Sequence, residues 1–529
     1  MVTRVEAAEA VGVAPRAADP VGPELVLAGV VGADLHVPLV GGGTARYVNL
    51  DYAASAPALV GVWDRVQAFL PWYSSVHRGA GFRSQVATAA YEGARDVVRG
   101  FLGGRPDDTV IFTRNTSDAI NLLARCLAHR TTVVTTLVEH HANLLPWRRY
   151  HTAIELPVPA TPAELLDRFD DTLGRIPGGQ PSLLAVTGAS NVTGEVWPIA
   201  ELAALAHRHG ARILVDCAQL APHRAVDIAG LDLDWVALSG HKMYAPFGSG
   251  ALVGRPDGLD RADPYLAGGG SVAWVSAQGA AWTGLPDRHE GGSPNVIGAF
   301  AMAAACSELR RIGMDAIAVE ERRLGDRLRA RLAEVPGLVR YQTWPGDPDR
   351  VGISAFSLNG RDHAEVATVL SAEHGIGVRS GSFCAHPLLA HIAGGVDGWR
   401  PGCGEDVPGA IRASLGLGSR EEDIDRLADA LLEIGVHGPR WTYRAGPDGT
   451  VVPDPDDRPA PAFLGSVGCH GCRAVKWTPL IPCSALASRV WPAGGGVYHR
   501  GQMSAQPSRI LLTRRLFLDF GARNTCSCI

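Results

Sequence analysis

Lysine is nearly absent from this sequence, and one of its two lysines stands where covalent chemistry is feasible. The 529 residues include 49 lysines and arginines, yet only Lys242 and Lys476 are lysines. A lysine amine can lose its proton and form a Schiff base, whereas a guanidinium stays charged and makes no such imine. A lysine kept against this bias is either a chance survivor on the surface or a residue that arginine cannot replace.

The setting of Lys242 favours a chemical role. A predicted strand at residues 235–238 is followed by the tight polar loop 239–241 and then by Lys242. The glycines at positions 248 and 250 allow a backbone to approach a ligand closely. Because open α/β sheets bind ligands beyond the carboxyl ends of their strands, we expect Lys242 to lie in a ligand site.

Two other strand ends carry residues that suit an aromatic, phosphorylated ligand. Asp216 ends the predicted strand at 212–215, and a carboxylate there can pair with a protonated pyridine nitrogen; its alternative role is to cap the next turn. Residues 114–121 follow the strand at 110–112 and open a helix, whose free N–H groups and hydroxyls suit a phosphate. Thr116 or Ser117 would look the same as an ordinary N-cap, however.

A histidine pair follows a further strand, at residues 132–135. The imidazole of His140 or His141 can stack on an aromatic ring and shuttle protons. The alternative is a structural histidine.

Alternating apolar runs and helical patterns indicate the fold. Strands are predicted at 110–112, 132–135, 183–186, 212–215 and 235–238, with helices such as 117–127 and 199–209 between them. This alternation is typical of a mainly parallel sheet wrapped by helices. A long helical stretch, 301–335, leads into a smaller α+β unit. We predict an N-terminal arm (1–46), a large domain (47–300), a small C-terminal domain (301–436) and a linker (437–462).

Composition excludes several classes of protein. A net charge of −5 does not favour binding to nucleic acid or an anionic membrane surface. No apolar run approaches the roughly 20 residues of a spanning helix. The N-terminus lacks the pattern of a signal peptide, so we expect a cytoplasmic protein whose ten cysteines are not paired in disulfides.

The end of the chain differs in composition. Residues 463–529 hold eight Lys/Arg, a single acid and five of the ten cysteines. Cys469–Cys472 and Cys526–Cys528 are pairs of potential ligands, but the second has poor zinc spacing, so we expect no metal. We predict a disordered tail, or one translated out of frame past the natural end.

Several motifs together resemble a known family. They are Leu50-Asp-Tyr-Ala-Ala-Ser-Ala-Pro, Val76-His-Arg-Gly, Glu139-His-His-Ala-Asn-Leu-Leu-Pro-Trp, Ser190-Asn-Val-Thr-Gly, Val215-Asp-Cys-Ala-Gln, Ser239-Gly-His-Lys, Glu290-Gly-Gly-Ser-Pro-Asn and Ile411-Arg-Ala-Ser-Leu. The chain resembles class V fold-type I enzymes that use pyridoxal 5′-phosphate (PLP), most closely group II cysteine desulfurases and selenocysteine lyases. The resemblance implies an α/β fold with a large, mainly parallel seven-stranded sheet domain and a smaller C-terminal α+β domain.

The resemblance also implies a role for each matching residue. Lys242 would anchor PLP covalently, His140 would stack on its ring, and Arg412 would bind the substrate carboxylate, a task for which a planar fork suits better than an ammonium. Asp216 would pair with the pyridinium and Gln219 with the phenolic oxygen. The phosphate would be held by Thr116, Ser117, Ser239 and His241, and Asn191 would lie near the substrate. Gly292 and Ser293 would reach the phosphate of a neighbouring subunit, which implies a homodimer.

The loop from Val378 to Leu388 resembles the family's cysteine loop, with Cys384 as the nucleophile. The implied reaction converts L-cysteine to L-alanine and leaves a persulfide on Cys384 for an acceptor protein. Arg379 and His386 would favour the thiolate, and Arg379 would also face the substrate. Where the family usually has two histidines before the cysteine, this chain has Ser382 and Phe383, and residues 391–409 are longer than usual.

These departures keep other reactions open. The chain could be another class V enzyme, such as a selenocysteine lyase, a C–S lyase or an aminotransferase, in which Cys384 is not the nucleophile. A catalytically silent binding protein is a further alternative, which the matches at Lys242, Asp216, His140 and Arg412 disfavour.

Overall fold

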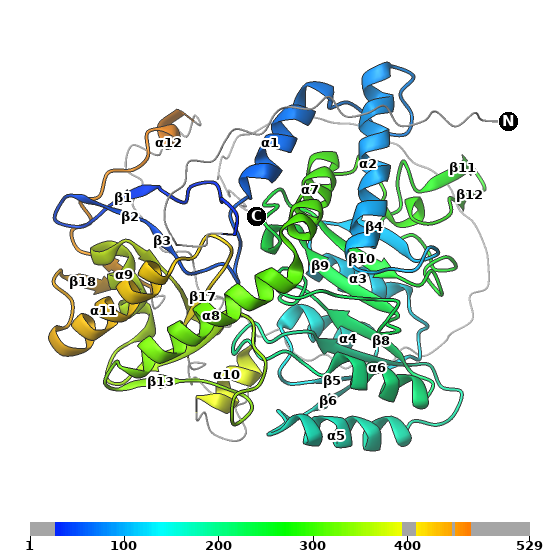
Figure 1. Cartoon of the computed structure of the whole chain (residues 1–529). Coiled ribbons are helices and arrows are strands. Elements are labelled where there is room, and N and C mark those ends of the chain that lie inside the picture. Colours follow the sequence, from blue (N-terminus) through cyan, green and yellow to red (C-terminus); the bar gives the residue numbers. More distant parts are fainter. Residues whose placement is uncertain (1–26, 394–408, 447–449, 467–529) are drawn as a thin grey trace, which may run out of the picture. The chain divides into compact units, whose positions relative to one another are not determined.

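A seven-stranded sheet forms the centre of the computed structural model, which describes residues 27–393, 409–446 and 450–466 (Figure 1). Its strand order is β4-β10-β9-β8-β7-β5-β6, and only β10 runs antiparallel to its neighbours. The strands are β4 (Thr109–Thr113), β5 (Thr132–Thr136), β6 (Thr152–Leu156), β7 (Ser182–Thr187), β8 (Arg212–Asp216), β9 (Trp235–Ser239) and β10 (Gly250–Gly254). The predicted seven-stranded, mainly parallel sheet is confirmed, with β6 and β10 added to the five strands expected.

Both faces of this sheet are buried, which explains the nearly unbroken apolar strands. Along β8, Ile213 and Val215 pack into one hydrophobic cluster, whereas Leu214 between them packs into another on the opposite face. The helices that cover the sheet are α1 (Val60–Phe69), α2 (Phe82–Phe101), α3 (Thr116–Cys126), α4 (Leu145–Tyr150), α5 (Pro162–Gly174), α6 (Ile199–Arg208) and α7 (Val296–Ile312). Helices α3 and α4 contribute side chains to the hydrophobic cluster that contains Leu214, and α5 and α6 contribute to the cluster that contains Ile213 and Val215.

The long helical stretch predicted at 301–335 is two helices. Helix α7 ends at Ile312 and α8 (Met314–Ala333) begins after Gly313, whose φ of 96° is open to glycine but strained for other residues. Residue 300, the predicted end of the large domain, therefore lies inside α7. The domain boundaries stay predictions.

A four-stranded antiparallel sheet follows, in the order β13-β14-β17-β16. It consists of β13 (Leu338–Arg340), β14 (Ile353–Leu358), β16 (Arg379–Gly381) and β17 (Ala410–Ser414), with α9 (His363–His374), α10 (His386–Ile392) and α11 (Glu421–His437) near it. The N-terminal strand β3 (Val48–Asn49) pairs in parallel with β15 (Ile376–Gly377). Val48 and Leu50 are buried in the same hydrophobic cluster as Leu328 and Leu427, so the small unit contains residues from before the large sheet.

The segment 437–462, predicted as a linker, includes two paired strands. Strands β18 (Tyr443–Ala445) and β19 (Val451–Pro453) form a hairpin. The carboxylate of Glu373 on α9 accepts hydrogen bonds from the Arg440 and Trp441 amides and from the Tyr443 hydroxyl. These bonds hold the segment against α9, and the alternation of apolar and polar residues in it was too short to predict a strand.

The remaining elements are short. They are β1 (His36–Pro38), β2 (Thr44–Arg46), β11 (Val272–Ser276), β12 (Gly279–Trp282), α12 (Phe463–Ser466) and the 3-10 turns η1 (Leu70–Trp72), η2 (His141–Asn143), η3 (Gly240–Lys242) and η4 (Asp287–His289). None of the helices within the described residues is long and apolar enough to cross a membrane. From residue 467 on, the predicted basic tail lies outside the described residues.

Candidate active site

The residues predicted to do chemistry meet at the carboxyl ends of β5, β7, β8 and β9. They line a cavity of about 250 Å³ that is partly open to solvent. Its lining includes Thr116, Ser117, His140, Asn191, Asp216, Gln219, Ser239, His241, Lys242, Arg379, Cys384 and Arg412. His386, Gly292 and Ser293 are the residues given a role by the family resemblance that do not line this cavity.

Lys242 ends the turn η3 directly after β9. The turn is tight because Gly240 packs against Ser249, where an added Cβ would come within 2.7 Å of the Ser249 hydroxyl. Burial lowers the pKa of the Lys242 amine to about 8, against the opposing effect of the Asp216 carboxylate. A sizeable fraction of the amine is therefore neutral near pH 8, the form that can attack a carbonyl.

Asp216 is the last residue of β8, where it is 5% exposed. Its Oδ1 accepts a 2.9 Å hydrogen bond from the Ala218 amide, and its Oδ2 makes none within the described part of the chain. Burial raises the pKa of this carboxyl, and Lys242 counters the shift. Asp216 thus keeps a free acceptor that a protonated ring nitrogen would satisfy.

The start of α3 forms the side of the cavity suited to an anion. Asn115 caps the helix by accepting from the Asp118 amide, and Thr116 donates its amide to the Ser239 hydroxyl at 2.8 Å. The Thr116 and Ser239 hydroxyls are also 2.7 Å apart. The glycine-rich stretch was expected to lie close to a ligand. Its Gly250 instead lies close to the chain itself, because an added Cβ on Gly250 would lie 2.6 Å from the Asn115 Cα.

His140 and His241 are both neutral at physiological pH. Burial lowers the pKa of His140 to about 3 and that of His241 to about 4, and the charge of Lys242 adds to both shifts. The Nδ1 of His140 accepts a 3.0 Å hydrogen bond from the Ala142 amide, so the proton of this ring is on Nε2. Each neutral imidazole therefore carries one N–H donor at the lining of the cavity.

Arg412 on β17 faces the same cavity from the four-stranded sheet. It is 3% exposed, and its guanidinium donates to the Asn191 carbonyl at 2.9 Å and to Asp51 at 3.2 Å. The Arg412 Nε has no partner among the described residues. Arg379 is opposite Arg412 in the pairing of β16 with β17, and its exposed guanidinium lies 4.0 Å from Asp51.

Cys384 lies in the loop between β16 and α10. It is exposed, and its backbone and that of Phe383 adopt the left-handed conformation, with φ values of 53° and 51°. The Cys384 carbonyl accepts from the His141 amide at 2.8 Å, and the Phe383 carbonyl accepts from the Asn191 side chain at 2.8 Å. These two bonds attach the loop to the large sheet. Residues 394–408, most of the segment predicted to be longer than usual, lie outside the described residues.

Gly292 and Ser293 are exposed and do not line the cavity of their own chain. Glu290 lies two residues before Gly292 in the motif, and its side chain, which is 6% exposed, accepts from Arg95, Tyr91 and the Phe112 amide. Glu290 therefore anchors the segment to α2 and β4, while Gly292 and Ser293 stay at the surface.

Three residues have roles at the site that the sequence did not predict, because only their contacts in the structure show these roles. Asp51 pairs with Arg412, Phe383 covers the guanidinium of Arg412, and Glu139, the residue before His140, is fully buried. Burial raises the pKa of Glu139 to about 8, although Asn143 and the Thr187 amide donate to it. Asp51 and Glu139 lie within motifs that the sequence analysis quotes, and this position is the sequence signal that could have identified them.

No group of three or more potential metal ligands gathers anywhere in the described ranges. The cysteine pairs 469–472 and 526–528 are outside those ranges.

The polar groups of the cavity fit PLP. The Asp216 Oδ2 is a free acceptor for the pyridinium, and Gln219, which donates to the Ala53 carbonyl, has a buried Oε1 without a partner in the described chain. The amine of Lys242 lies on the same cavity, and the N-terminus of α3 faces it with hydroxyl groups. Each chemical part of PLP thus has a matching group.

Residues 48–427 match the family model described as Aminotransferase class-V. The cysteine desulfurase of Dickeya dadantii (strain 3937) is 38% identical over 396 residues, which cover 73% of this chain and 91% of that protein. A probable cysteine desulfurase of Halalkalibacterium halodurans is 35% identical over 395 residues, which cover 73% of this chain and 92% of that protein.

Solved structures agree with these relatives. The crystal structure of the cysteine desulfurase CsdA from Escherichia coli is 32% identical, with a TM-score of 0.63 over 73% of this chain and 95% of that one. The apo structure of a cysteine desulfurase from Thermococcus onnurineus NA1 is 30% identical, with a TM-score of 0.65 over 73% and 94%. The chain therefore belongs to the class V aminotransferase family and is a PLP-dependent enzyme of fold type I.

Proposed function

We propose that this enzyme is a cysteine desulfurase that converts L-cysteine to L-alanine and retains the sulfur as a persulfide on Cys384. The observation that carries the proposal is that Lys242, Arg412 and Cys384, from three distant segments, line one cavity. A covalent anchor, a carboxylate receptor and a thiol are the three groups that this reaction needs.

The large sheet supplies the groups that hold the cofactor. When bound, PLP supplies an electron sink for bonds broken next to the substrate amine. Asp216 and Gln219 would hold the ring of the bound cofactor, with His140 beside it. Thr116, Ser117, Ser239 and His241 would hold its phosphate.

The substrate carboxylate binds in the plane of the Arg412 guanidinium. The unpartnered Nε of Arg412 offers one N–H for this contact, and Asn191 and Arg379 complete the wall around it. Lys242 Nζ, whose pKa of about 8 leaves part of it neutral, takes the proton from the substrate Cα.

Cys384 receives the sulfur. Its thiolate attacks the sulfur of the substrate, an S–S bond forms, and the bond between that sulfur and the substrate Cβ breaks. The electron pair of the broken bond passes to the substrate carbon, which takes up a proton to become the methyl group of alanine. Cys384 is left as a persulfide.

The test is incubation of the PLP-loaded protein with L-cysteine while alanine and sulfide are measured. Cys384→Ala should abolish alanine formation, and mass spectrometry of the parent should find one extra sulfur on the Cys384 peptide. Cys306→Ala is the matched control, because Cys306 is fully buried on α7 away from the cavity. Alanine formation that survives in Cys384→Ala would instead favour another class V reaction, in which this thiol is not the nucleophile.

We also propose that the persulfide is passed to an acceptor protein. Cys384 is exposed, so a thiol of a second protein can approach its sulfur from solvent. An acceptor should raise the rate of alanine formation in the absence of added reductant.

We further propose a homodimer in which Gly292 and Ser293 reach the phosphate site of the partner subunit. Both residues are exposed, and the Gly292 amide donates to Gly269, just before the hairpin of β11 and β12. This hairpin exposes Trp274 and Val275, by 58% and 62%. Exposed apolar side chains of this size are typical of an interface. Light scattering should find a dimer for the parent and a monomer for Trp274→Asp.

Finally, we propose a cytoplasmic location. All four described cysteines are unpaired, and a reducing compartment keeps the Cys384 thiol ready to accept sulfur. Fractionation of cells should recover the protein with cytosolic markers.

A further inference from the structure

Phe383 covers one face of the Arg412 guanidinium. The carbon at the centre of this guanidinium lies 5.0 Å from the centre of the Phe383 ring, within the range of a cation–π interaction. Both side chains are buried, with 8% and 3% exposed. The other contacts of Arg412 go to Asn191 and Asp51 through its N–H groups, so the ring adds a restraint from the face of the guanidinium plane.

The backbone of Phe383 is strained in the same place. Phe383 and Cys384 are consecutive left-handed residues, which for non-glycine residues persist only where surrounding contacts hold them. The carbonyls of these two residues accept hydrogen bonds from Asn191 and His141. The side chain of Phe383 adds contacts of its own, with the main hydrophobic cluster and with Arg412.

Asn191 closes a cycle of contacts between the two residues. Its carbonyl accepts from Arg412, and its side chain donates to the Phe383 carbonyl. Arg412, Phe383 and Asn191 therefore touch one another pairwise, and Cys384 is the next residue along the chain. Two series of contacts therefore join the guanidinium to the residue next to the thiol, one through the ring and one through Asn191.

We propose that Phe383 is a positioning residue, which couples the tilt of the carboxylate-binding Arg412 to the place of the Cys384 thiol. The inference rests on the proposed function of Arg412 and Cys384. Phe383 itself neither donates a proton nor binds the substrate through a charge. Its role is to hold the strained loop so that the thiol faces a substrate bound at Arg412.

A double-mutant cycle that needs no turnover tests this coupling. The rate of alkylation of Cys384 by iodoacetamide is measured from the modified Cys384 peptide in the parent, Phe383→Leu, Arg412→Lys and the double variant. Leucine keeps an apolar side chain but removes the ring, and lysine keeps the charge but removes the flat face. Each single change should raise the rate roughly 3- to 30-fold, the range of a lost cation–π contact.

The double variant decides the result. If the ring and the guanidinium act on the thiol through their mutual contact, the double variant should react no faster than either single variant. Effects that multiply, or an unchanged rate in Phe383→Leu, would overturn the proposal. Phe383→Tyr keeps the ring and should react close to the parent rate. If Phe383→Leu does not fold, Phe383→Met takes its place in the cycle.

Kinetics with L-cysteine separate this inference from the proposed function. Phe383→Leu should raise KM and lower kcat for alanine formation together, while the absorbance of bound PLP stays that of the parent. A parent that forms no alanine would refute the proposed function, whereas the alkylation cycle would still report on the coupling. A fall in PLP absorbance of Phe383→Leu would assign the residue to the cofactor site and reject a role at the thiol.

Discussion

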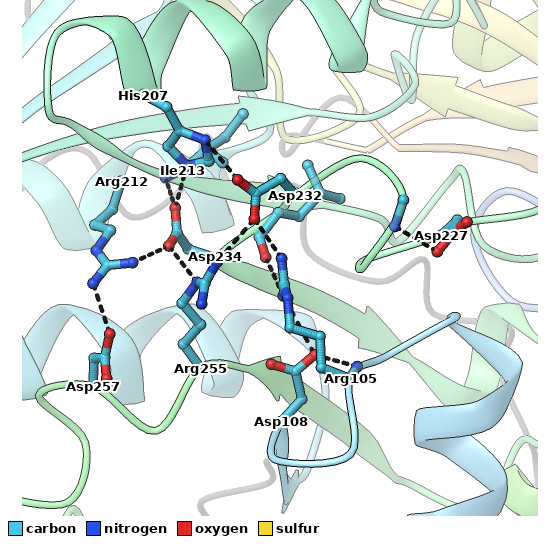
Figure 2. A network of polar contacts seen from close by, with 12 residues as sticks. Arg105, Asp108, His207, Arg212, Ile213, Asp227, Asp232, Asp234, Arg255 and Asp257 are labelled. Atoms are coloured by element: carbon cyan, nitrogen blue, oxygen red, sulfur yellow. Dashed lines mark hydrogen bonds and ion pairs between the residues drawn. The ribbon is translucent and has the colours of Figure 1, made fainter.

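The amino-terminal and carboxyl edges of the central sheet each hold a buried aspartate, and the two carboxylates differ in how many of their hydrogen-bond acceptors are used. At the amino-terminal edge, Asp234 accepts from the Ile213 amide, His207 and Arg212, and pairs with Arg255 (Figure 2). At the carboxyl edge, Asp216 accepts from a single amide. Their exposure is 0% and 5%, so burial does not distinguish them. The difference is that one oxygen of the Asp216 carboxylate accepts no hydrogen bond from the described residues. A buried acceptor without a partner indicates a place for a ligand, so we call the carboxyl edge the working edge of the sheet.

The largest effect should come from the amine at the working edge. Lys242→Ala removes the covalent anchor and the base, so alanine formation should fall by at least about 10³-fold. The unfolding midpoint of the cofactor-free protein should not fall, because the change removes a buried amine that lacks an ion-pair partner. Absorbance spectroscopy and urea denaturation measure the two effects. A large loss of stability would show that Lys242 also supports the fold.

The two aspartates themselves should give opposite results on conversion to asparagine. Asp234→Asn removes the charge of a fully buried carboxylate to which the partly exposed Arg212, Arg255 and His207 donate, so the free energy of unfolding should fall by about 2–3 kcal/mol.

Asp216→Asn should change the free energy of unfolding by less than about 1 kcal/mol, since it removes a charge that burial disfavours. Its turnover should nevertheless collapse. Denaturation of both cofactor-free variants, followed by the activity of each after loading with PLP, compares the edges directly. Equal losses of stability would break the contrast.

The pH dependence of PLP binding should sharpen the contrast between the two edges of the sheet. Burial lowers the pKa of Lys242 to about 8, and only the neutral amine attacks the aldehyde of PLP. The rate at which the cofactor-free protein captures PLP should therefore rise as the pH increases from 6 to 8, and should level off above that, roughly two units below an ordinary lysine. Stopped-flow absorbance measures this rate. A rise that continued to pH 10 would contradict the lowered pKa.

The smallest effect is expected at the exposed end of the network at the amino-terminal edge. Asp232 contacts Arg105, Arg255 and His207, but its side chain is 59% exposed. Asp232→Asn should lower the free energy of unfolding by less than about 1 kcal/mol, because solvent screens such pairs. Turnover should match the parent. A loss as large as that of Asp234→Asn would mean that the network acts as one unit.

Residues whose role follows from their own strand could be predicted from the sequence. Asp216, Ser239 and Lys242 each stand at or just after a strand end, and parallel strands bring their carboxyl ends to one edge. Asp51 and Phe383 could not be assigned in this way. Their partner Arg412 lies on β17, far from both residues along the chain, and neither periodicity nor spacing encodes such a long-range contact.

The pairing of β3 with β15 sets the order in which the active site is assembled during synthesis. Val48 pairs with Ile376, so β3 is synthesised roughly 330 residues before the strand with which it pairs. Synthesis of those residues takes about 15–65 s at ordinary translation rates. Arg412 emerges later still. The nascent large sheet can fold around Lys242 before the substrate-binding wall exists, and the apolar side chains of Val48 and Leu50 stay uncovered through that interval. A chaperone that shields this early segment should therefore raise the yield of active enzyme more than one that acts after release from the ribosome.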